Sequence, residues 1–217
     1  MKKKYLILIL AILLVLSINV VSAADNTTKE VISLSEENTL GDPVSIGTFG
    51  DLQKDINSST TGQIRLNKSY TYDSSESEYL TGININKTIE IDGNGYTIDG
   101  NHTARIFNIT AGGVVLKNIN FVNANATLKS GGAIYNGANN LKILNCTFNS
   151  NHAKYGGAIY TLGNITIEDS TFKSNDAYNE TKGSNHHVGA IFIKGKQSSI
   201  KNSIFDSNYA NVHGAIY

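Results

Sequence analysis

The chain has 217 residues, with 18 basic and 18 acidic side chains, so its formal net charge is zero. This balance, with arginine only at Arg65 and Arg105, argues against a nucleic-acid-binding protein, which needs a basic face. A single cysteine, Cys146, excludes a disulfide framework and a cysteine-based zinc site. A hydrophobic content of 40% is too high for a disordered chain, and the 27 asparagines are the compositional feature that needs an explanation.

The first 23 residues have the pattern of a secretory signal peptide. Three lysines at positions 2–4 precede an almost wholly apolar run over residues 5–21, and small residues follow at 21–23. We expect cleavage between Ala23 and Ala24, so that the rest of the chain is exported to the cell surface, the cell envelope or the medium. The alternative is an uncleaved membrane anchor, because the apolar run reaches the lower limit of about 17 residues for a spanning helix.

Residues 24–44 are polar and without a period, and we interpret them as a leader. Residues 45–80 are predicted to form an N-terminal cap that covers the end of the next domain. Within them Phe49, Leu52 and Ile56 share one face of a helix over about 48–57. Thr48, with Asp51 three residues later, is typical of a capping box at the start of that helix. Residues 63–72 then alternate as a strand does.

Residues 81–217 consist of an internal repeat. The box Gly-Gly-Ala-Ile-Tyr begins at residues 131 and 156, and variants of it begin at 188 and 213. The alanines of these boxes are 25, 32 and 25 residues apart. Each repeat holds three short strands with apolar residues at period 2, which predicts one coil of an all-β parallel solenoid. Successive coils of such a solenoid stack about 4.8 Å apart and are stabilised by their neighbours.

A second box in each repeat ends in phenylalanine. These phenylalanines are expected to stack inside the solenoid, each contributing about 1.5–3 kcal/mol by burial; they are Phe121, Phe148, Phe172 and Phe205. In one coil the predicted inward residues are Leu141, Ile143, Cys146, Phe148, Ala158 and Tyr160. Cys146 aligns with Ser170 and Ser203, and we interpret it as a small buried filler rather than a nucleophile.

Asparagines recur at fixed places beside each phenylalanine. One set precedes it and is expected to form tight corners, because Asn tolerates left-handed backbone angles: Asn118, Asn145, Asp169 and Asn202. A second set lies three residues after it: Asn151, Asn175 and Asn208. Stacked asparagines can hydrogen-bond from coil to coil. The glycine before each Ala-Ile pair is expected to permit another corner, with positive φ.

The 32-residue spacing contains an insertion over residues 178–187. Loops that interrupt a regular scaffold often carry binding function, so Tyr178, Asn179, His186 and His187 are candidate binding residues. A neutral insertion is the alternative. The two adjacent histidines lack a third ligand, so no metal and no cofactor is expected.

Glycosylation is possible in an exported chain with so many Asn-X-Ser/Thr sequons. The sequons begin at Asn26, Asn57, Asn67, Asn86, Asn101, Asn108, Asn125, Asn145, Asn164 and Asn179. The alternative is chance, because a composition rich in Asn, Ser and Thr produces sequons without selection.

The two repeated boxes, Gly-Gly-Ala-Ile and Phe-x-x-Asn, resemble the repeats of the polymorphic outer-membrane proteins of chlamydiae. The Ile-Glu-Ile-Asp-Gly-Asn-Gly-Tyr-Thr-Ile-Asp-Gly stretch over residues 89–100, after a signal peptide and a Thr-Phe-x-x-Leu helix, is similar to adhesin-like surface proteins of methanogenic archaea. The resemblance covers about residues 45–217. It implies a right-handed parallel β-helix, display at the cell surface and a role in adhesion. Proteins of this kind usually have many more coils and an anchoring segment, which this sequence does not show.

Carbohydrate-active enzymes also use this fold, so catalysis is the alternative function. A glycosidase needs two carboxylates about 5–9.5 Å apart across the scissile bond. Asp92 with Asp99, or Glu168 with Asp169, are the candidate pairs, but turn contexts favour structural roles for them. A polysaccharide lyase needs carboxylates clustered on one face to hold calcium and a basic residue that acts as the base, and both Arg105 and Lys117 stand without such a cluster. We therefore expect no enzymatic activity.

The sequence thus predicts a secreted or surface-displayed adhesin-like protein that binds glycans or proteins of a host or neighbouring cell. An inactive fragment of a longer surface protein is a further alternative. Residues 214–217 begin a new coil without a polar cap. We expect a truncated chain, or one whose C-terminal end stacks on further β-helix coils or on a partner.

Overall fold

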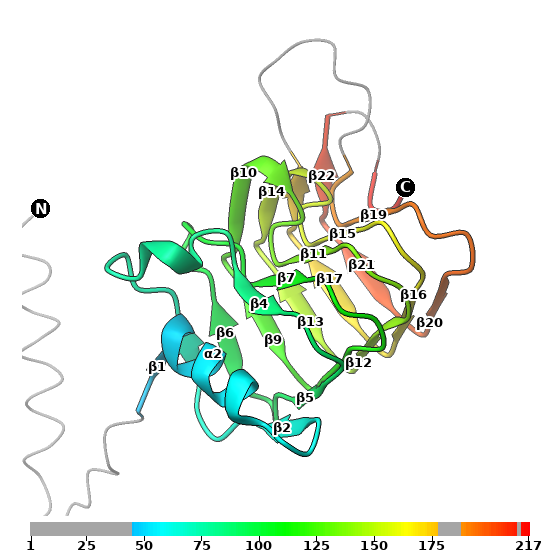
Figure 1. Cartoon of the computed structure of the whole chain (residues 1–217). Helices are drawn as coiled ribbons and strands as arrows, with labels where there is room; N and C mark the ends of the chain where they lie inside the picture. The colour runs from blue at the N-terminus through cyan, green and yellow to red at the C-terminus, as the bar shows by residue number, and fades with distance from the viewer. Residues whose placement is uncertain (1–44, 178–187, 212–213) are drawn as a thin grey trace, which may run out of the picture. The chain divides into compact units, whose positions relative to one another are not determined.

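The computed structural model describes residues 45–177, 188–211 and 214–217 (Figure 1). Over these residues the chain is an all-β, right-handed parallel β-helix of about 5 turns, with one α-helix near its N-terminal end. The predicted fold class is confirmed. The predicted signal peptide with its Ala23/Ala24 cleavage site, the leader and the candidate binding loop 178–187 lie outside the described residues.

Four parallel sheets, A to D, form the wall. Sheet A contains β1 (Gly47–Thr48), β3 (Tyr70–Thr71), β6 (Thr97–Asp99), β9 (Asn120–Val122), β13 (Thr147–Asn149), β17 (Thr171–Lys173) and β21 (Ile204–Asp206). Sheet B contains β2 (Gln63–Arg65), β5 (Glu90–Asp92), β8 (Val115–Lys117), β12 (Leu141–Leu144), β16 (Ile165–Glu168) and β20 (Ser199–Lys201). Sheet C contains β4 (Ile83–Ile85), β7 (Phe107–Ile109), β11 (Ile134–Asn136), β15 (Ile159–Thr161) and β19 (Ile191–Ile193). Sheet D contains β10 (Asn125–Ser130), β14 (His152–Tyr155), β18 (Asp176–Ala177) and β22 (Tyr209–Ala210).

The fourth sheet corrects the prediction of three strands per coil. From β8 onward the chain passes through sheets B, A, D and C in turn, whereas the earlier coils have no strand in sheet D. The inward residues of the first three sheet D strands are the alanines Ala126, Ala153 and Ala177. Because these strands are short and their inward side chains small, they produce no clear alternation of apolar and polar residues.

The predicted capping helix is present as α2 (Phe49–Ser58), which lies across the N-terminal end of the solenoid (Figure 1). Thr48 Oγ1 accepts a hydrogen bond from the Asp51 amide at 3.3 Å, and the Asp51 carboxylate accepts one from the Thr48 amide at 3.2 Å. The predicted capping box is therefore correct. The apolar face of the helix is fully buried against the first coils. Residues 63–72 form β2 and β3 in two different sheets, rather than one strand, and a 3₁₀ helix, η1 (Ser77–Tyr79), follows.

The phenylalanines stack in the interior of sheet A, in register from β9 to β21. Ring centroids of successive phenylalanines are 4.7, 4.7 and 4.8 Å apart, with interplanar angles of 12°, 2° and 4°. The spacing equals the separation of hydrogen-bonded strands, so each ring covers the faces of its neighbours. The column continues toward the capping helix through Ile98 and Tyr70.

A buried asparagine ladder lies beside the phenylalanine column. Asn175 Nδ2 donates to Phe148 O and to Asn208 Oδ1, both at 2.9 Å. Its own Oδ1 accepts from the Asn151 amide at 3.1 Å and from Asn151 Nδ2 at 2.9 Å. Asn151 and Asn175 are 0% exposed. Since buried polar groups need partners, these bonds fix the corner of each coil to the next one.

The repeated glycines act differently from the prediction. Positive φ belongs to the first glycine of each pair, Gly131 (φ 72°) and Gly156 (φ 60°), and not to the glycine directly before alanine. The second glycine is needed because the next coil passes too close for a side chain. A Cβ at Gly132 would lie 2.1 Å from Gly157 O, and one at Gly157 would lie 2.4 Å from Gly189 O.

Candidate functional site

A second column of aromatic side chains lies on the outer surface of sheet C, and we call it the aromatic column: Tyr135, Tyr160, Phe192 and Tyr217. Strand register aligns its first three members, and Tyr217 follows the bridge that pairs Ile216 with Ile191. Successive ring centroids are 5.7, 4.9 and 5.0 Å apart, and the rings are stacked. The solenoid thus presents one aromatic ring per coil along one line of its surface.

The predicted inward orientation of Tyr160 is wrong. Ala158 and Ile159 are both 0% exposed, so two consecutive residues point inward where the chain leaves the glycine corner. Strand alternation then starts from Ile159, which turns Tyr160 outward and Thr161 inward. The same phase holds in β11, where Ile134 and Asn136 are buried and Tyr135 lies between them on the outside.

Lys194 lies over the middle of the aromatic column. Its Nζ is 5.6 Å from the centre of the Tyr160 ring and 5.9 Å from that of Phe192, within cation–π range. A hydrogen bond with Tyr160 raises the pKa of Lys194, so the ammonium stays charged. These side chains, with Tyr155, Ile193 and Tyr217, line a surface pocket of about 400 Å³. The pocket therefore combines aromatic surface with one positively charged side chain, Lys194.

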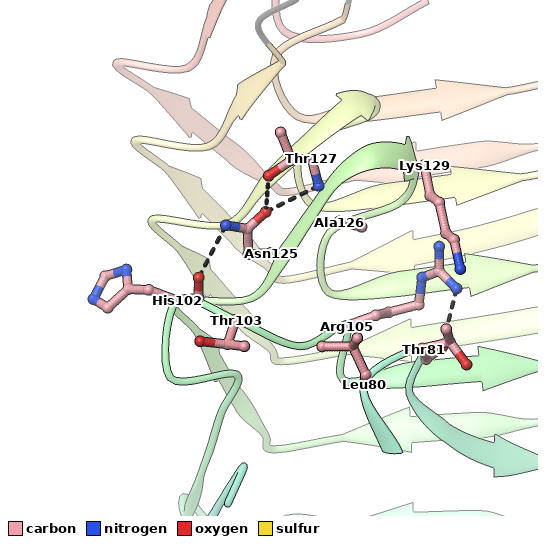
Figure 2. Close-up of a pocket in the computed structure, with 9 residues that line it drawn as sticks. All are labelled: Leu80, Thr81, His102, Thr103, Arg105, Asn125, Ala126, Thr127 and Lys129. Atoms are coloured by element: carbon pink, nitrogen blue, oxygen red, sulfur yellow. Dashed lines mark hydrogen bonds between the residues drawn. The ribbon is translucent and has the colours of Figure 1, made fainter. Parts of the chain in front are cut away.

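A second pocket, of about 330 Å³, adjoins the N-terminal end of the aromatic column, and we call it the arginine pocket (Figure 2). Its lining consists of Leu80, Thr81, His102, Thr103, Arg105, Asn125, Ala126, Thr127 and Lys129. The Arg105 guanidinium lies over the Tyr135 ring, with its central carbon 5.5 Å from the ring centre. Burial lowers the pKa of Arg105, although an arginine in a protein remains protonated. A positive charge therefore stands at this end of the column.

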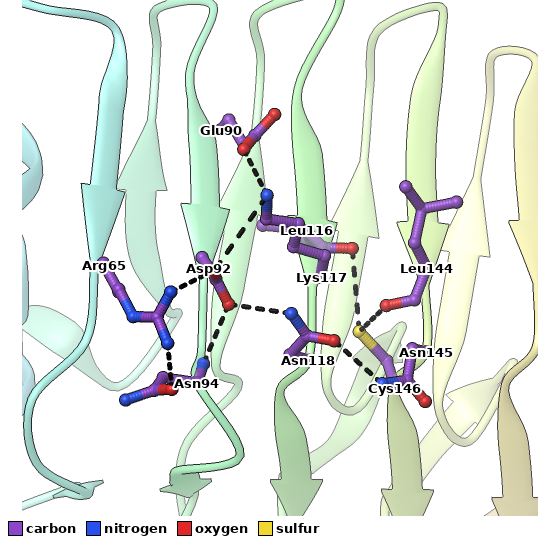
Figure 3. A network of polar contacts seen from close by, with 10 residues as sticks. All are labelled: Arg65, Glu90, Asp92, Asn94, Leu116, Lys117, Asn118, Leu144, Asn145 and Cys146. Carbon is purple, nitrogen blue, oxygen red and sulfur yellow. Dashed lines mark hydrogen bonds and ion pairs between the residues drawn. The ribbon is translucent and has the colours of Figure 1, made fainter.

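A polar network covers the corner between sheets B and A (Figure 3). Asp92 accepts hydrogen bonds from the Asn94 amide at 3.0 Å and from Asn118 Nδ2 at 2.9 Å, and it pairs with Arg65 at 3.4 Å. Lys117 pairs with Glu90 at 2.6 Å and lies 3.9 Å from Asp92. Burial by itself would raise the pKa of Asp92, but these hydrogen bonds and cations outweigh it and lower that pKa.

The carboxylates considered for catalysis thus hold the turns and coils together. Asp99 accepts from the Asn101 amide at 2.7 Å and from Asn123 of the next coil at 3.3 Å, as Asp92 does with its own neighbours. These two residues belong to different sheets, A and B. Glu168 lies 4.0 Å from Lys201, and Asp169 has a left-handed φ of 52° at a corner.

The structure places the corner residues at left-handed angles. The φ values are 56° for Asn118, 49° for Asn145, 52° for Asp169 and 49° for Asn202. Asn145 Nδ2 donates to Asn118 Oδ1 at 2.8 Å, which extends the ladder that begins at Asp92 (Figure 3). The amide of Asn145 therefore bridges two coils, a role that competes with a glycan at the same position.

Cys146 is buried, and its Sγ contacts the carbonyls of Leu144 and Leu116 at 3.3 and 3.6 Å. Burial raises the pKa of the Cys146 thiol to about 12, so it is not a nucleophile at neutral pH. Across residues 45–177, 188–211 and 214–217, no group of three or more His, Cys, Asp or Glu side chains is placed to hold a metal ion. No helix within these ranges is long and apolar enough to span a bilayer.

The sequence analysis did not identify the aromatic column or Arg105 as parts of a candidate binding site. The signal for the column was present, because the fifth residue of each box is Tyr135, Tyr160, Phe192 or Tyr217. Strict alternation of inward and outward residues, counted from Ala158, wrongly assigned Tyr160 to the core, because Ala158 and Ile159 both point inward. No protein-family model, no curated protein and no solved structure matches this chain.

Proposed function

We propose that this chain is a non-catalytic, adhesin-like binding protein, secreted or held at the cell surface, and that the aromatic column contacts its ligand. The observation that carries the proposal is the position of the column on the outer wall of sheet C. Its rings are in register over three strands, β11, β15 and β19, and the isolated bridge next to Tyr217. Its ligand is a glycan or protein of another cell or of a host.

The four rings form a line on the outer wall, where Tyr217 is exposed, Tyr135 and Tyr160 are half-buried, and Phe192 is only 6% exposed. The interior of the solenoid is already filled by its own phenylalanine column, so the outer rings add little to the core. Contiguous apolar surface rimmed by polar groups marks binding sites, and tyrosine suits them because its ring is apolar and its hydroxyl is polar. Since the rings follow the solenoid axis, the surface fits an extended ligand.

The carboxylates support binding rather than catalysis. Asp92 and Asp99 are engaged by main-chain amides and asparagines of neighbouring coils, and this use leaves them poorly suited to act as acid and base on a sugar. The apolar N-terminal segment and the resemblance to surface adhesins support export. A carbohydrate-active enzyme, or an inactive fragment of a longer surface protein, remains an outcome that the experiment distinguishes.

The test is a binding measurement on a panel of immobilised glycans and on intact cells. Tyr160→Ala should weaken binding by about tenfold or more, because truncating a central aromatic contact costs most of the affinity in a typical interface. Tyr209→Ala is the matched control, since Tyr209 is 58% exposed on sheet D, away from the column. Thermal unfolding of both variants verifies that the solenoid is intact.

Each result has a defined meaning. Equal binding by Tyr160→Ala and the wild-type protein would remove the aromatic column from the proposal. Product release from a polysaccharide, abolished by Asp92→Asn or Asp99→Asn, would establish an enzyme instead. A chain that neither binds nor turns over any ligand of the panel would indicate the inactive fragment.

A further inference from the structure

The arginine pocket is created by an irregularity in β10. Between the pairs Ala126↔Ala153 and Ser130↔Tyr155, β10 advances by four residues while β14 advances by two. The two extra residues form a bulge, which Asn125 stabilises by accepting a hydrogen bond from the Thr127 amide at 2.9 Å. Such bulges re-aim side chains and are frequent next to functional sites. Here the bulge leaves Thr127 and Lys129 exposed at the edge strand of sheet D.

Arg105 is buried at the base of this pocket, with only 6% of its surface exposed. Its three side-chain nitrogens donate to main-chain carbonyls: Nε to Gly131 at 3.0 Å, one terminal nitrogen to Thr81 at 3.0 Å and the other to Ser130 at 2.9 Å. These bonds account for three of the five N–H groups of a guanidinium. None of the ion pairs formed by the described residues includes Arg105.

A buried charge normally has a counterion, because carbonyl dipoles offset only part of the cost of desolvation. Among residues 45–177, 188–211 and 214–217, no carboxylate lines the arginine pocket, whereas a second cation, Lys129, does. Figure 2 shows the Lys129 side chain pointing toward the guanidinium, with the His102 ring turned away from both. The Thr81 hydroxyl adds a neutral donor, whereas the hydroxyls of Thr103 and Thr127 already donate to Asn101 O and Asn125 Oδ1. The pocket therefore lacks one component, an anion.

We propose that the arginine pocket binds the carboxylate of an acidic sugar, so that the ligand of the aromatic column is a polysaccharide containing uronic acid. Guanidinium groups pair with planar oxyanions through two N–H groups, the number left over at Arg105. The sugar assignment comes from the contact between Arg105 and Tyr135, which makes the pocket continuous with the column. Lys194 supplies a second positive charge along the same line. This inference rests on the proposed function, because it names the ligand of that same surface.

The experiment compares one sugar chain in two charge states. Affinities are measured for a glucuronate-containing oligosaccharide and for the same oligosaccharide after its carboxyl groups have been reduced to alcohols. The wild-type chain should bind the acidic form about tenfold more tightly, and added salt should reduce this preference. Lys129→Glu should remove the preference for the acidic form. Lys142→Glu is the matched control, an exposed lysine on β12 of sheet B.

Arg105→Gln should also abolish the preference for the acidic form. Because Arg105 bridges carbonyls of three residues, this variant can lose stability, and its unfolding temperature is measured in parallel. Lys129→Glu keeps the inference testable if Arg105→Gln does not fold, since the substitution of an exposed side chain usually changes stability little.

Equal affinity for both forms, or equal effects of Lys129→Glu and Lys142→Glu, would overturn the inference. Tighter binding of a sulfated form than of the uronate would overturn the carboxylate assignment. Tyr160→Ala should weaken the binding of both forms. If Tyr160→Ala weakens binding while Lys129→Glu has no effect, the aromatic column is retained as a binding surface and the arginine pocket is refuted. If neither form binds, free glucuronate is titrated and the amide NMR signals of Thr127 and Lys129 are followed. Saturable shifts there would retain the pocket and refute the column, and their absence would refute the pocket.

Discussion

Two columns of stacked aromatic rings run along this solenoid, one inside sheet A and one outside sheet C. The interior phenylalanines are parallel within 12° and spaced at 4.7–4.8 Å. The exterior rings are spaced at 4.9–5.7 Å and tilted by up to 26°. Three rings of the interior stack, Phe121, Phe148 and Phe172, are 0% exposed. In the exterior stack Tyr135 and Tyr160 are half-buried and Tyr217 is exposed. The looser geometry outside reflects this difference in confinement.

The comparison teaches that aromatic character does not decide on which side of the wall a residue lies. Phe148 and Tyr160 occur in the same coil, and each is the last residue of its repeated box. The side on which the residue lies is decided by the backbone conformation at the preceding corner, because that conformation sets which residues of the strand point inward. A left-handed residue at Asn145 places Phe148 inside, whereas two consecutive inward residues after Gly157 place Tyr160 outside. Mutations that shorten matched residues in the two columns should therefore have very different costs.

The largest effect is expected from truncating an interior ring. Phe148→Ala leaves a cavity between Phe121 and Phe172, so the free energy of unfolding should fall by about 3–5 kcal/mol. Tyr160→Ala should cost only about 0.5–1.5 kcal/mol, the worth of its stacking contacts. Equilibrium unfolding in urea measures both losses. Similar losses for the two variants would contradict the assignment of the second column to the surface.

An intermediate effect is expected from the asparagines. Asn175→Ala leaves the Asn151 amide and the Phe148 carbonyl without their partner in the interior, so stability should fall by about 2 kcal/mol or more. The control is Asn120→Ala, which removes an exterior bridge from Gly95 to Thr147 that water can replace. We expect a loss of about 0.5 kcal/mol or less there. Thermal unfolding would refute the inside–outside distinction if both variants lost the same stability.

The smallest effect is expected at the exterior polar corner. The lowered pKa of Asp92 means that its contribution to stability is present above the ordinary carboxyl pKa of 3.8 and is lost as the pH falls through the folded value. Asp92→Asn should therefore be less stable than wild type by up to about 1 kcal/mol near neutral pH. The difference should shrink as the pH falls below 3.8 and disappear once the pH is below the folded pKa of Asp92. A difference that does not shrink at all below pH 3.8 would show that the contribution is not ionic.

The sequence was sufficient to predict the solenoid and the capping helix. Similar boxes that recur at spacings of 25, 32 and 25 residues indicate stacked coils of similar structure, and Thr48 with Asp51 fixes the start of α2 by local chemistry alone. The side of Tyr160 was predicted wrongly because alternation was carried across a corner at which two inward residues follow one another. Sheet D was missed because its inward alanines resemble loop residues.

The arginine pocket was beyond prediction for a different reason. It requires Arg105 to meet residues 24 to 26 positions away in the sequence, and it requires a bulge in β10 that breaks the register with β14. Neither follows from a repeat, since both are departures from it. Pairing between coils converts such a local departure into a defined cavity.

The outer face of sheet C changes character along its length. Strand register aligns Asn84 and Asn108 with the tyrosines that follow, and these two asparagines form their own hydrogen bond at 2.9 Å. The inward neighbours of this position stay apolar through the change: Ile83, Phe107, Ile134 and Ile159. A change of one outward residue per coil thus alters the chemistry of the outer surface, while the apolar interior of the solenoid is unchanged. Exchange or duplication of whole coils would therefore generate new recognition surfaces in modular steps, on a scaffold whose folding rules are already met.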